Sequence, residues 1–139
     1  MTDSFLFDAG SILLLVRELG ELAPDILLKS STIPLAYYEV GNAVWKECFL
    51  LKRLDVEKAV RLLASVFAIM GEMDVMGFGD ERFGVAVLDA AGRLNVTYYD
   101  ASYLVAAQEQ DRILVTDDER LRMAAEKMGL KATKSKPLQ

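Results

Sequence analysis

The 139-residue sequence contains no histidine. That absence excludes Ser-His-Asp and Cys-His catalytic groups, His-based zinc sites, and metal-free RNA cleavage by an imidazole acid or base. Cys48 is the only cysteine, so the chain can form neither an internal disulfide nor a cysteine metal cage. We interpret Cys48 as a small core residue because it lies in an apolar helical stretch. Any hydrolase built from this sequence must use carboxylates, and we expect a metal ion with them.

Long hydrophobic runs are also missing. The longest purely aliphatic run, Ile12 to Val16, is far too short to span a bilayer. The first residues carry Asp3 and neither Lys nor Arg, whereas a secretory signal begins with positive charge. We therefore expect a cytoplasmic protein that does not contact a membrane.

The sequence has no excess of positive charge, since its formal net charge is -5. This argues against a broad basic face for nucleic acid. The objection weakens if many of the acids surround bound cations, because such ions reverse the local charge.

The length fits one domain, which can bury about two-thirds of its surface and needs no disulfide or metal to fold. We expect this domain at residues 1–133, followed by a loose basic tail at 134–139. Hydrophobic residues make up 53% of the chain, somewhat more than one small core needs. The surplus favours a homodimer, with the helix from Val56 to Met70 and the helix before Leu51 as candidate surfaces.

Apolar runs and helical periodicities alternate along the chain. Strands are expected at 5–7, 30–33, 73–76, 113–115 and 130–133, the last at a sheet edge, with a turn at 77–80. Helices are expected at 12–20, 25–29, 34–51, 55–71, 83–94, 100–110 and 116–129. In the fourth helix, the spacing of Val60, Leu63, Phe67 and Met70 predicts one apolar face. The alternation predicts an α/β fold, with a central, mostly parallel sheet of four or five strands flanked by helices.

Several acidic residues lie where such a sheet would gather them, because ligands bind at the carboxyl ends of its strands. The set comprises acids that end strands or lie near helix starts: Asp8, Glu39, Asp100, Asp117 and Asp118. Brought together without a counter-ion, these carboxylates would repel one another. Mg²⁺ or Mn²⁺ would relieve that repulsion, because hard divalent cations prefer oxygen ligands.

Each acid also has an ordinary structural interpretation. Asp8 or Asp100 could cap the helix that follows it. Thr116 and Glu119 fit a capping box, which would make Asp117 and Asp118 first-turn acids that favour the helix dipole. Glu39 could be a solvated surface residue. Spacing alone leaves these alternatives open.

Four segments in order resemble the PIN-domain family, and within it the VapC-type toxins of prokaryotic toxin–antitoxin pairs. They are an opening strand with its acid, an E-x-x-N helix, a Y-D-A-x-Y helix and a strand-T-x-D-x-x-L motif, at residues 7–11, 38–46, 99–107 and 114–121. The resemblance spans almost the whole chain. One departure is Gly10, where the family often carries Ser or Asn, so Ser11 is an imperfect substitute.

The resemblance implies a PIN-like three-layer fold and a metal-dependent endoribonuclease. It implies that Asp8, Glu39, Asp100 and Asp118 ligate one or two Mg²⁺ or Mn²⁺ ions. A water activated by the metal would cut RNA and leave a 5′-phosphate and a 3′-hydroxyl. A cognate antitoxin and a homodimer are the implied partners. The T-x-D-x-x-L pattern selects Asp118 as the ligand, with Asp117 turned to solvent or to a metal water.

Supporting roles follow for neighbouring polar residues. The hydroxyl of Thr116 could hold a water or a carboxylate, and Ser11 could contribute near Asp8. Asn42 lies one helical turn after Glu39 and could orient it.

Two further groups are candidates for RNA contacts. Tyr99, Tyr103 and Trp45 could stack on RNA bases, although packing is the simpler interpretation. Lys46, Lys52 and Arg53 could contact phosphates, or could be a solvated helix end.

Two other functions remain open from the sequence. The first is a PIN domain that binds RNA or protein without cutting, although such domains usually lack one or more acids. The second is a receiver-like signalling domain with Asp74 in its acidic pocket, although no suitably placed lysine follows Val115.

Overall fold

The computed structural model describes residues 4–77 and 79–139. Asp3, and Phe78 of the turn expected at 77–80, lie outside the described residues. Five short strands form one sheet, in the order β3-β2-β1-β4-β5, and every neighbouring pair is parallel. The strands are β1 (Phe5–Phe7), β2 (Ser31–Thr32), β3 (Asp74–Val75), β4 (Ile113–Val115) and β5 (Ala132–Thr133). The predicted α/β class is confirmed.

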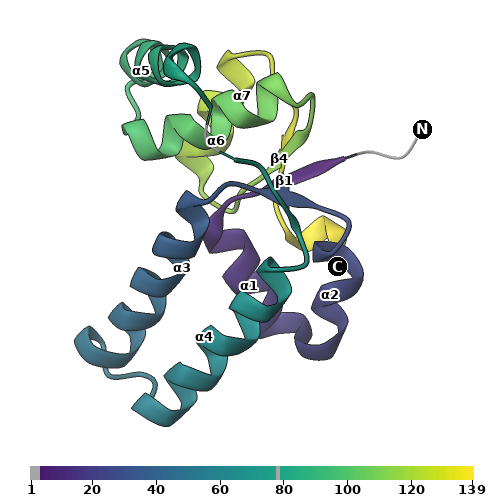
Figure 1. The fold of residues 1–139 in the computed structure, drawn as a ribbon, viewed down its shortest axis with the longest axis vertical. Coiled ribbons are helices and arrows are strands. Elements are labelled where there is room, and N and C mark those ends of the chain that lie inside the picture. Colours follow the sequence, from purple (N-terminus) through teal and green to yellow (C-terminus); the bar gives the residue numbers. More distant parts are fainter. Residues whose placement is uncertain (1–3, 78) are drawn as a thin grey trace.

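Helices cover both faces of this sheet. They are α1 (Ala9–Leu19), α2 (Ala23–Leu27), α3 (Leu35–Trp45), α4 (Val56–Met70), α5 (Glu81–Leu94), α6 (Tyr98–Glu109) and α7 (Glu119–Lys127). A 3₁₀ turn at Gly20–Leu22 precedes α2, and a π-helical turn at Lys46–Leu50 extends α3. In Figure 1, α1 to α4 lie on one side of the sheet and α5 to α7 on the other, which makes three layers. None of the helices in the described ranges is long and apolar enough to cross a membrane.

Side-chain caps fix where the helices begin. Asp8 accepts a hydrogen bond from the Ser11 backbone N–H at 2.9 Å, so α1 begins at Ala9 and not at Ile12 as predicted. Asp55 caps α4, as predicted. The predicted capping box at Thr116 is wrong, because Asp118 is the cap of α7.

The hydrophobic core is built on the two central strands. Leu6 and Phe7 of β1 and Leu114 and Val115 of β4 are almost fully enclosed, as expected for parallel strands that are covered on both faces. The predicted apolar face of α4 is partly wrong. Val60 and Phe67 are exposed, and the buried side of α4 carries Ala59, Val66 and Met70. Each helical position turns by about 100°, so a one-residue shift moves a side chain from core to surface.

The C-terminal residues 134–139, expected to form a loose basic tail, fold back in part. Ser135 is fully buried, and Lys136–Leu138 form a 3₁₀ turn after it. Ser135 donates hydrogen bonds to Asp117, which ties this segment to the carboxyl end of β4.

Candidate carboxylate site

The five acids singled out in the sequence line one cavity of about 420 Å³ at the carboxyl ends of β1 and β4. The remaining lining residues belong to α1 and α6: Ala9, Gly10, Ser11, Leu14 and Tyr103. The register of the two strands explains part of this convergence. Phe7 lies opposite Val115, and the Asp8 backbone N–H donates to the Val115 carbonyl at 3.1 Å. The residues that follow both strands therefore leave the sheet at one point.

Asp8 is the deepest of these acids and is almost fully buried. Burial raises its pKa, and hydrogen bonds from Thr116 and Ser11 oppose that rise only in part. The nearby Asp117 adds a repulsive contribution in the same direction as burial. Asp8 thus stabilises the start of α1 while carrying a carboxylate that its surroundings disfavour.

Glu39 is held from the opposite layer by Tyr103 of α6, whose phenolic O–H donates to Glu39 Oε1 at 2.6 Å. Partial burial raises the pKa of Glu39, the Tyr103 hydrogen bond lowers it, and repulsion from Asp100 and Asp8 raises it again. The pKa of Tyr103 is raised by its own burial and by Glu39, so its proton stays on the phenol. Glu39 is therefore a positioned carboxylate and not a freely rotating surface residue.

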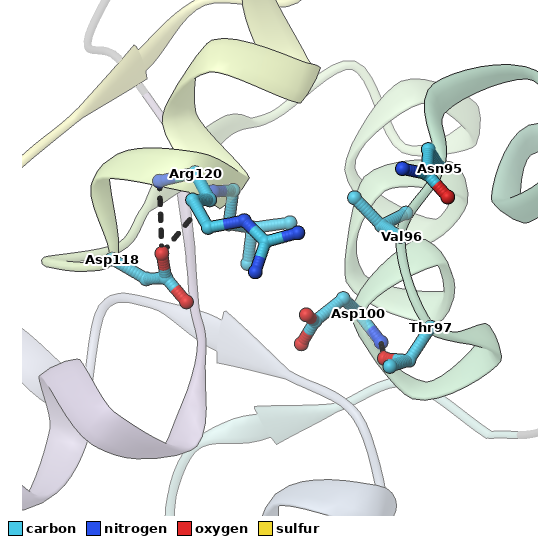
Figure 2. A pocket seen from close by; sticks show the side chains of 7 residues that line it. Asn95, Val96, Thr97, Asp100, Asp118 and Arg120 are labelled. Atoms are coloured by element: carbon cyan, nitrogen blue, oxygen red, sulfur yellow. Dashed lines mark hydrogen bonds between the residues drawn. The ribbon is translucent and has the colours of Figure 1, made fainter.

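Asp100 and Asp118 both line the carboxylate cavity. They also line a neighbouring hollow, where Figure 2 shows their carboxylates pointing toward each other. Burial is the main cause that raises the pKa of Asp100, and repulsion from Asp118 raises it further. A hydrogen bond with Thr97 and the positive charge of Arg120 lower it. Asp100 does not cap α6, because Thr97 does so by accepting from the Asp100 backbone N–H at 3.0 Å. Asp118 Oδ1 accepts from the backbone N–H groups of Arg120 and Leu121, at 2.9 and 3.3 Å.

Asp117 is enclosed in a separate hydrogen-bond network. Its Oδ2 accepts from the hydroxyls of Ser11 and Ser135, each at 2.8 Å. Its Oδ1 accepts from the Ser135 backbone N–H at 3.1 Å, and its own N–H donates to Ser11 Oγ at 3.0 Å. Both oxygens of Asp117 are therefore occupied, and the second oxygen of Asp118 has no hydrogen bond to any described residue.

The donor set suits a hard divalent cation. Desolvation and mutual repulsion raise the pKa values of Asp8, Glu39 and Asp100, and a cation would relieve that repulsion. Within residues 4–77 and 79–139, no three acids approach closely enough to enclose an ion as they stand. An ion at this site would therefore contact some of the carboxylates through water, as Mg²⁺ commonly does in proteins.

The other predicted residues fall into two groups. Thr116 is fully buried, hydrogen-bonds Asp8, and accepts from the Asp118 backbone N–H at 3.1 Å, so it links two of the acids. Asn42 is exposed and lines a groove of about 790 Å³ between α3 and α6, which borders the carboxylate cavity at Glu39. Tyr99 and Lys46 line the same groove.

Three further candidates line neither the groove nor the carboxylate cavity in the described structure: Trp45, Lys52 and Arg53. Arg53 forms an ion pair with Glu47 at 3.6 Å.

Sequence reasoning missed the roles of three residues. Tyr103, a candidate for stacking on RNA bases, instead donates a hydrogen bond to Glu39. It lies three residues after Asp100 and so on the same helix face, and this spacing could have indicated a role in the site. Arg120 faces Asp100 from α7, and Ser135 reaches Asp117 from the tail. No local pattern marks these two residues.

Comparisons with known proteins give the family. No family model matches the chain. Exonuclease VapC9 of Pyrobaculum aerophilum is 37% identical over 93 residues, which cover 67% of this chain and 65% of that protein. The match thus spans slightly less than two-thirds of the relative's length.

Solved structures share the fold over almost the whole chain. The crystal structure of PAE2754 from Pyrobaculum aerophilum superposes with a TM-score of 0.77 at 30% identity, covering 99% of this chain and 95% of that one. VapBC-1 of nontypeable Haemophilus influenzae has a TM-score of 0.61 at 12% identity, covering 96% and 98%, and supports the fold alone. With the acids of all four motifs lining one cavity, these matches show that the chain belongs to the PIN-domain family, as a VapC-type member.

Proposed function

We propose that this protein is a metal-dependent endoribonuclease and the toxin of a VapBC-type pair. The observation that carries the proposal is the single cavity lined by five carboxylates, in a chain without histidine. Such a site has no general base near neutral pH other than carboxylates, and a metal ion held by them would supply the activated water that phosphodiester hydrolysis needs. The name of the relative, an exonuclease, supports a nuclease and leaves the mode of cutting to experiment.

Asp8, Glu39, Asp100 and Asp118 would hold Mg²⁺ or Mn²⁺. An ion held there would lower the pKa of a bound water, so that this water could lose a proton near neutral pH and serve as the nucleophile for a phosphodiester, and its positive charge would offset the charge of the phosphate. The protein's own contribution is orientation. Tyr103 fixes Glu39, Thr116 links Asp8 to the Asp118 backbone, and Ser11 joins α1 to Asp117. Asp117 has no unoccupied oxygen, so we assign it to support and not to metal binding.

Two exposed apolar surfaces are available for partners. One lies at the end of the α3–α4 hairpin (Figure 1) and comprises Phe49, Leu50, Leu51, Val56 and Val60. The other is the groove between α3 and α6, lined in part by Tyr38, Tyr98 and Tyr99. We propose that the hairpin surface forms the homodimer and that a cognate antitoxin covers the groove, because the groove borders Glu39. The activity would be cytoplasmic, where RNA and antitoxin are both present.

The test uses a circular single-stranded RNA, its linear form and the matching circular DNA. An endoribonuclease linearises the circular RNA when Mg²⁺ or Mn²⁺ is added, leaves a 5′-phosphate and a 3′-hydroxyl, and stops with EDTA. Asp100→Asn keeps the size but removes a charge from the site, so cleavage should fall by orders of magnitude. Arg61→Gln on α4, remote from the cavity, is the matched control and should cut at the parent rate.

Other results would select other functions. Cleavage of the linear RNA alone would indicate an exonuclease. RNA binding without any cleavage would indicate a catalytically silent PIN domain, and robust cleavage in excess EDTA would exclude the metal mechanism.

A further inference from the structure

Besides the groove between α3 and α6, a smaller hollow of about 300 Å³ adjoins the carboxylate cavity, and Asp100 and Asp118 line both this hollow and the cavity. Its other walls come from the segment between α5 and α6 and from the first turn of α7: Asn95, Val96, Thr97, Arg120 and Leu121. The hollow is open to solvent at the rim of the proposed active site. A chain that crosses the carboxylates on this side must pass over it.

Among the described residues that line this hollow or the carboxylate cavity, Arg120 is the only basic one. Figure 2 shows its guanidinium pointing from α7 across the hollow, toward the side formed by Asn95 to Asp100. Arg120 forms no ion pair within 4.0 Å in the described part of the chain, and the same is true of Arg82 and Arg122, whereas the other five arginines each form one. The Arg120 charge is close enough to lower the pKa of Asp100, although burial and Asp118 outweigh it.

A site made of carboxylates alone repels a polyanion before any cation is shared with it. A guanidinium without a fixed carboxylate partner offers the opposite charge, and its planar fork matches two oxygens of a phosphate. The hollow that Arg120 lines shares Asp100 and Asp118 with the carboxylate cavity. A phosphate next to one bound at the carboxylates would therefore lie within reach of this hollow.

We propose that this hollow is a phosphate subsite in which Arg120 binds a backbone phosphate of the substrate strand, adjacent to the scissile phosphate. The inference rests on the proposed nuclease function and adds a residue outside the four acids of the family motif. Arg120 would position the strand over the carboxylates, so its loss should raise KM more than it lowers kcat. The alternative is that Arg120 serves only as a counter-ion for Asp100, in which case RNA affinity does not depend on it.

The test measures binding apart from cleavage. A fluorescent 12-nucleotide single-stranded RNA is titrated with the Asp8→Asn protein in Mg²⁺, and anisotropy is recorded at KCl concentrations from about 50 to 200 mM. In that background Arg120→Gln should weaken binding on the order of tenfold, the amount expected for one charge-assisted contact. It should also make the slope of log K against log[salt] shallower by about 0.7, the value for one phosphate on a single strand.

Two control variants sharpen the result. Arg120→Lys keeps the charge but loses the planar fork, so it should retain the salt slope and weaken binding by less than Arg120→Gln. Arg61→Gln removes the same charge from an exposed site on α4 and should change neither affinity nor slope.

The two proposals fail in different ways. Equal binding and equal slopes for Arg120→Gln and Arg61→Gln would overturn the phosphate subsite and leave the nuclease untouched. If the Asp8→Asn protein does not bind RNA and the unaltered protein does not cut it, the proposed function fails and the subsite fails with it.

Discussion

At the residue scale, Asp8 serves two requirements that conflict. Its carboxylate caps α1, yet burial, opposed only in part by Thr116 and Ser11, raises its pKa. A raised folded-state pKa means that the folded protein binds a proton more readily than the unfolded chain. The contribution of this group to stability is therefore complete below the unfolded pKa, about 3.9, and is lost as the pH rises through the folded value.

Replacing Asp8 by Asn tests this conflict. Asn keeps an oxygen to accept from the Ser11 N–H but carries no charge, so Asp8→Asn should stabilise the metal-free protein at pH 7. This gain in the free energy of unfolding should shrink toward zero near pH 4, because Asp8 is then protonated and uncharged like Asn. Urea unfolding in EDTA at the two pH values measures it. A variant less stable than the parent at pH 7 would show that the ionised carboxylate is better accommodated than its burial suggests.

Asp117 and Asp118 are neighbours with different expected roles. Both Asp117 oxygens accept hydrogen bonds, whereas Asp118 keeps one oxygen without a partner among the described residues. Asp118→Asn should therefore lower cleavage by orders of magnitude. Asp117→Asn should lower it about 10- to 100-fold, as for other supporting residues of metal sites.

Cleavage rates of the two variants at fixed Mg²⁺ decide the assignment, and circular dichroism checks that both fold. An inactive Asp117→Asn beside an active Asp118→Asn would mean that the T-x-D-x-x-L alignment is off by one residue.

At the element scale, the pairing of β1 with β4 and the fold-back of the C-terminal segment together build the site. The register that places Phe7 opposite Val115 delivers Asp8 and Thr116 side by side. The C-terminal segment then reaches the same point, because Ser135 donates two hydrogen bonds to Asp117. The Asp117 carboxylate, which follows β4, thus holds α1 through Ser11 and the C-terminal segment through Ser135.

Ser135→Ala should loosen this connection. It removes the hydroxyl donor of a buried pair and leaves Asp117 partly unsatisfied, which costs about 1–3 kcal/mol. Chemical denaturation of the variant measures the loss, and the exposed Lys134→Ala provides a control that should stay near the parent. If Ser135→Ala and Lys134→Ala were equally stable, the hydrogen bond from the Ser135 hydroxyl to Asp117 would contribute nothing measurable to the stability of the fold.

At the scale of the whole molecule, the proposed homodimer would cover the exposed apolar side chains of the hairpin surface. Light scattering at micromolar concentration should give about twice the 15.4 kDa chain mass. Val60→Glu places a charge on the hairpin surface and should return the mass to that of the monomer. Tyr38→Glu in the groove should leave the dimer intact, and the reverse pattern would move the dimer interface to the groove.

The family assignment removes one alternative at this scale. The receiver-like reading required Asp74 in an acidic pocket. Asp74 lies instead on the edge strand β3, where it accepts from Ser31 and pairs with Arg112 at 3.2 Å, away from the other acids.

The sequence by itself determined the α/β class, the position of all five strands and the acids that gather at their ends. Each depends on short-range rules: strand periodicity, capping by Asp8 and Asp55, and the geometry that brings parallel strand ends to one edge. Only the tertiary structure decided that Tyr103 holds Glu39 across 64 residues, that Ser135 binds Asp117, and that Val60 faces outward. These outcomes depend on how the layers pack, and no pattern within one helical turn carries that information. The same reason explains Arg120, whose sequence neighbours suggest a solvated helix and whose place in the fold puts its charge beside Asp100.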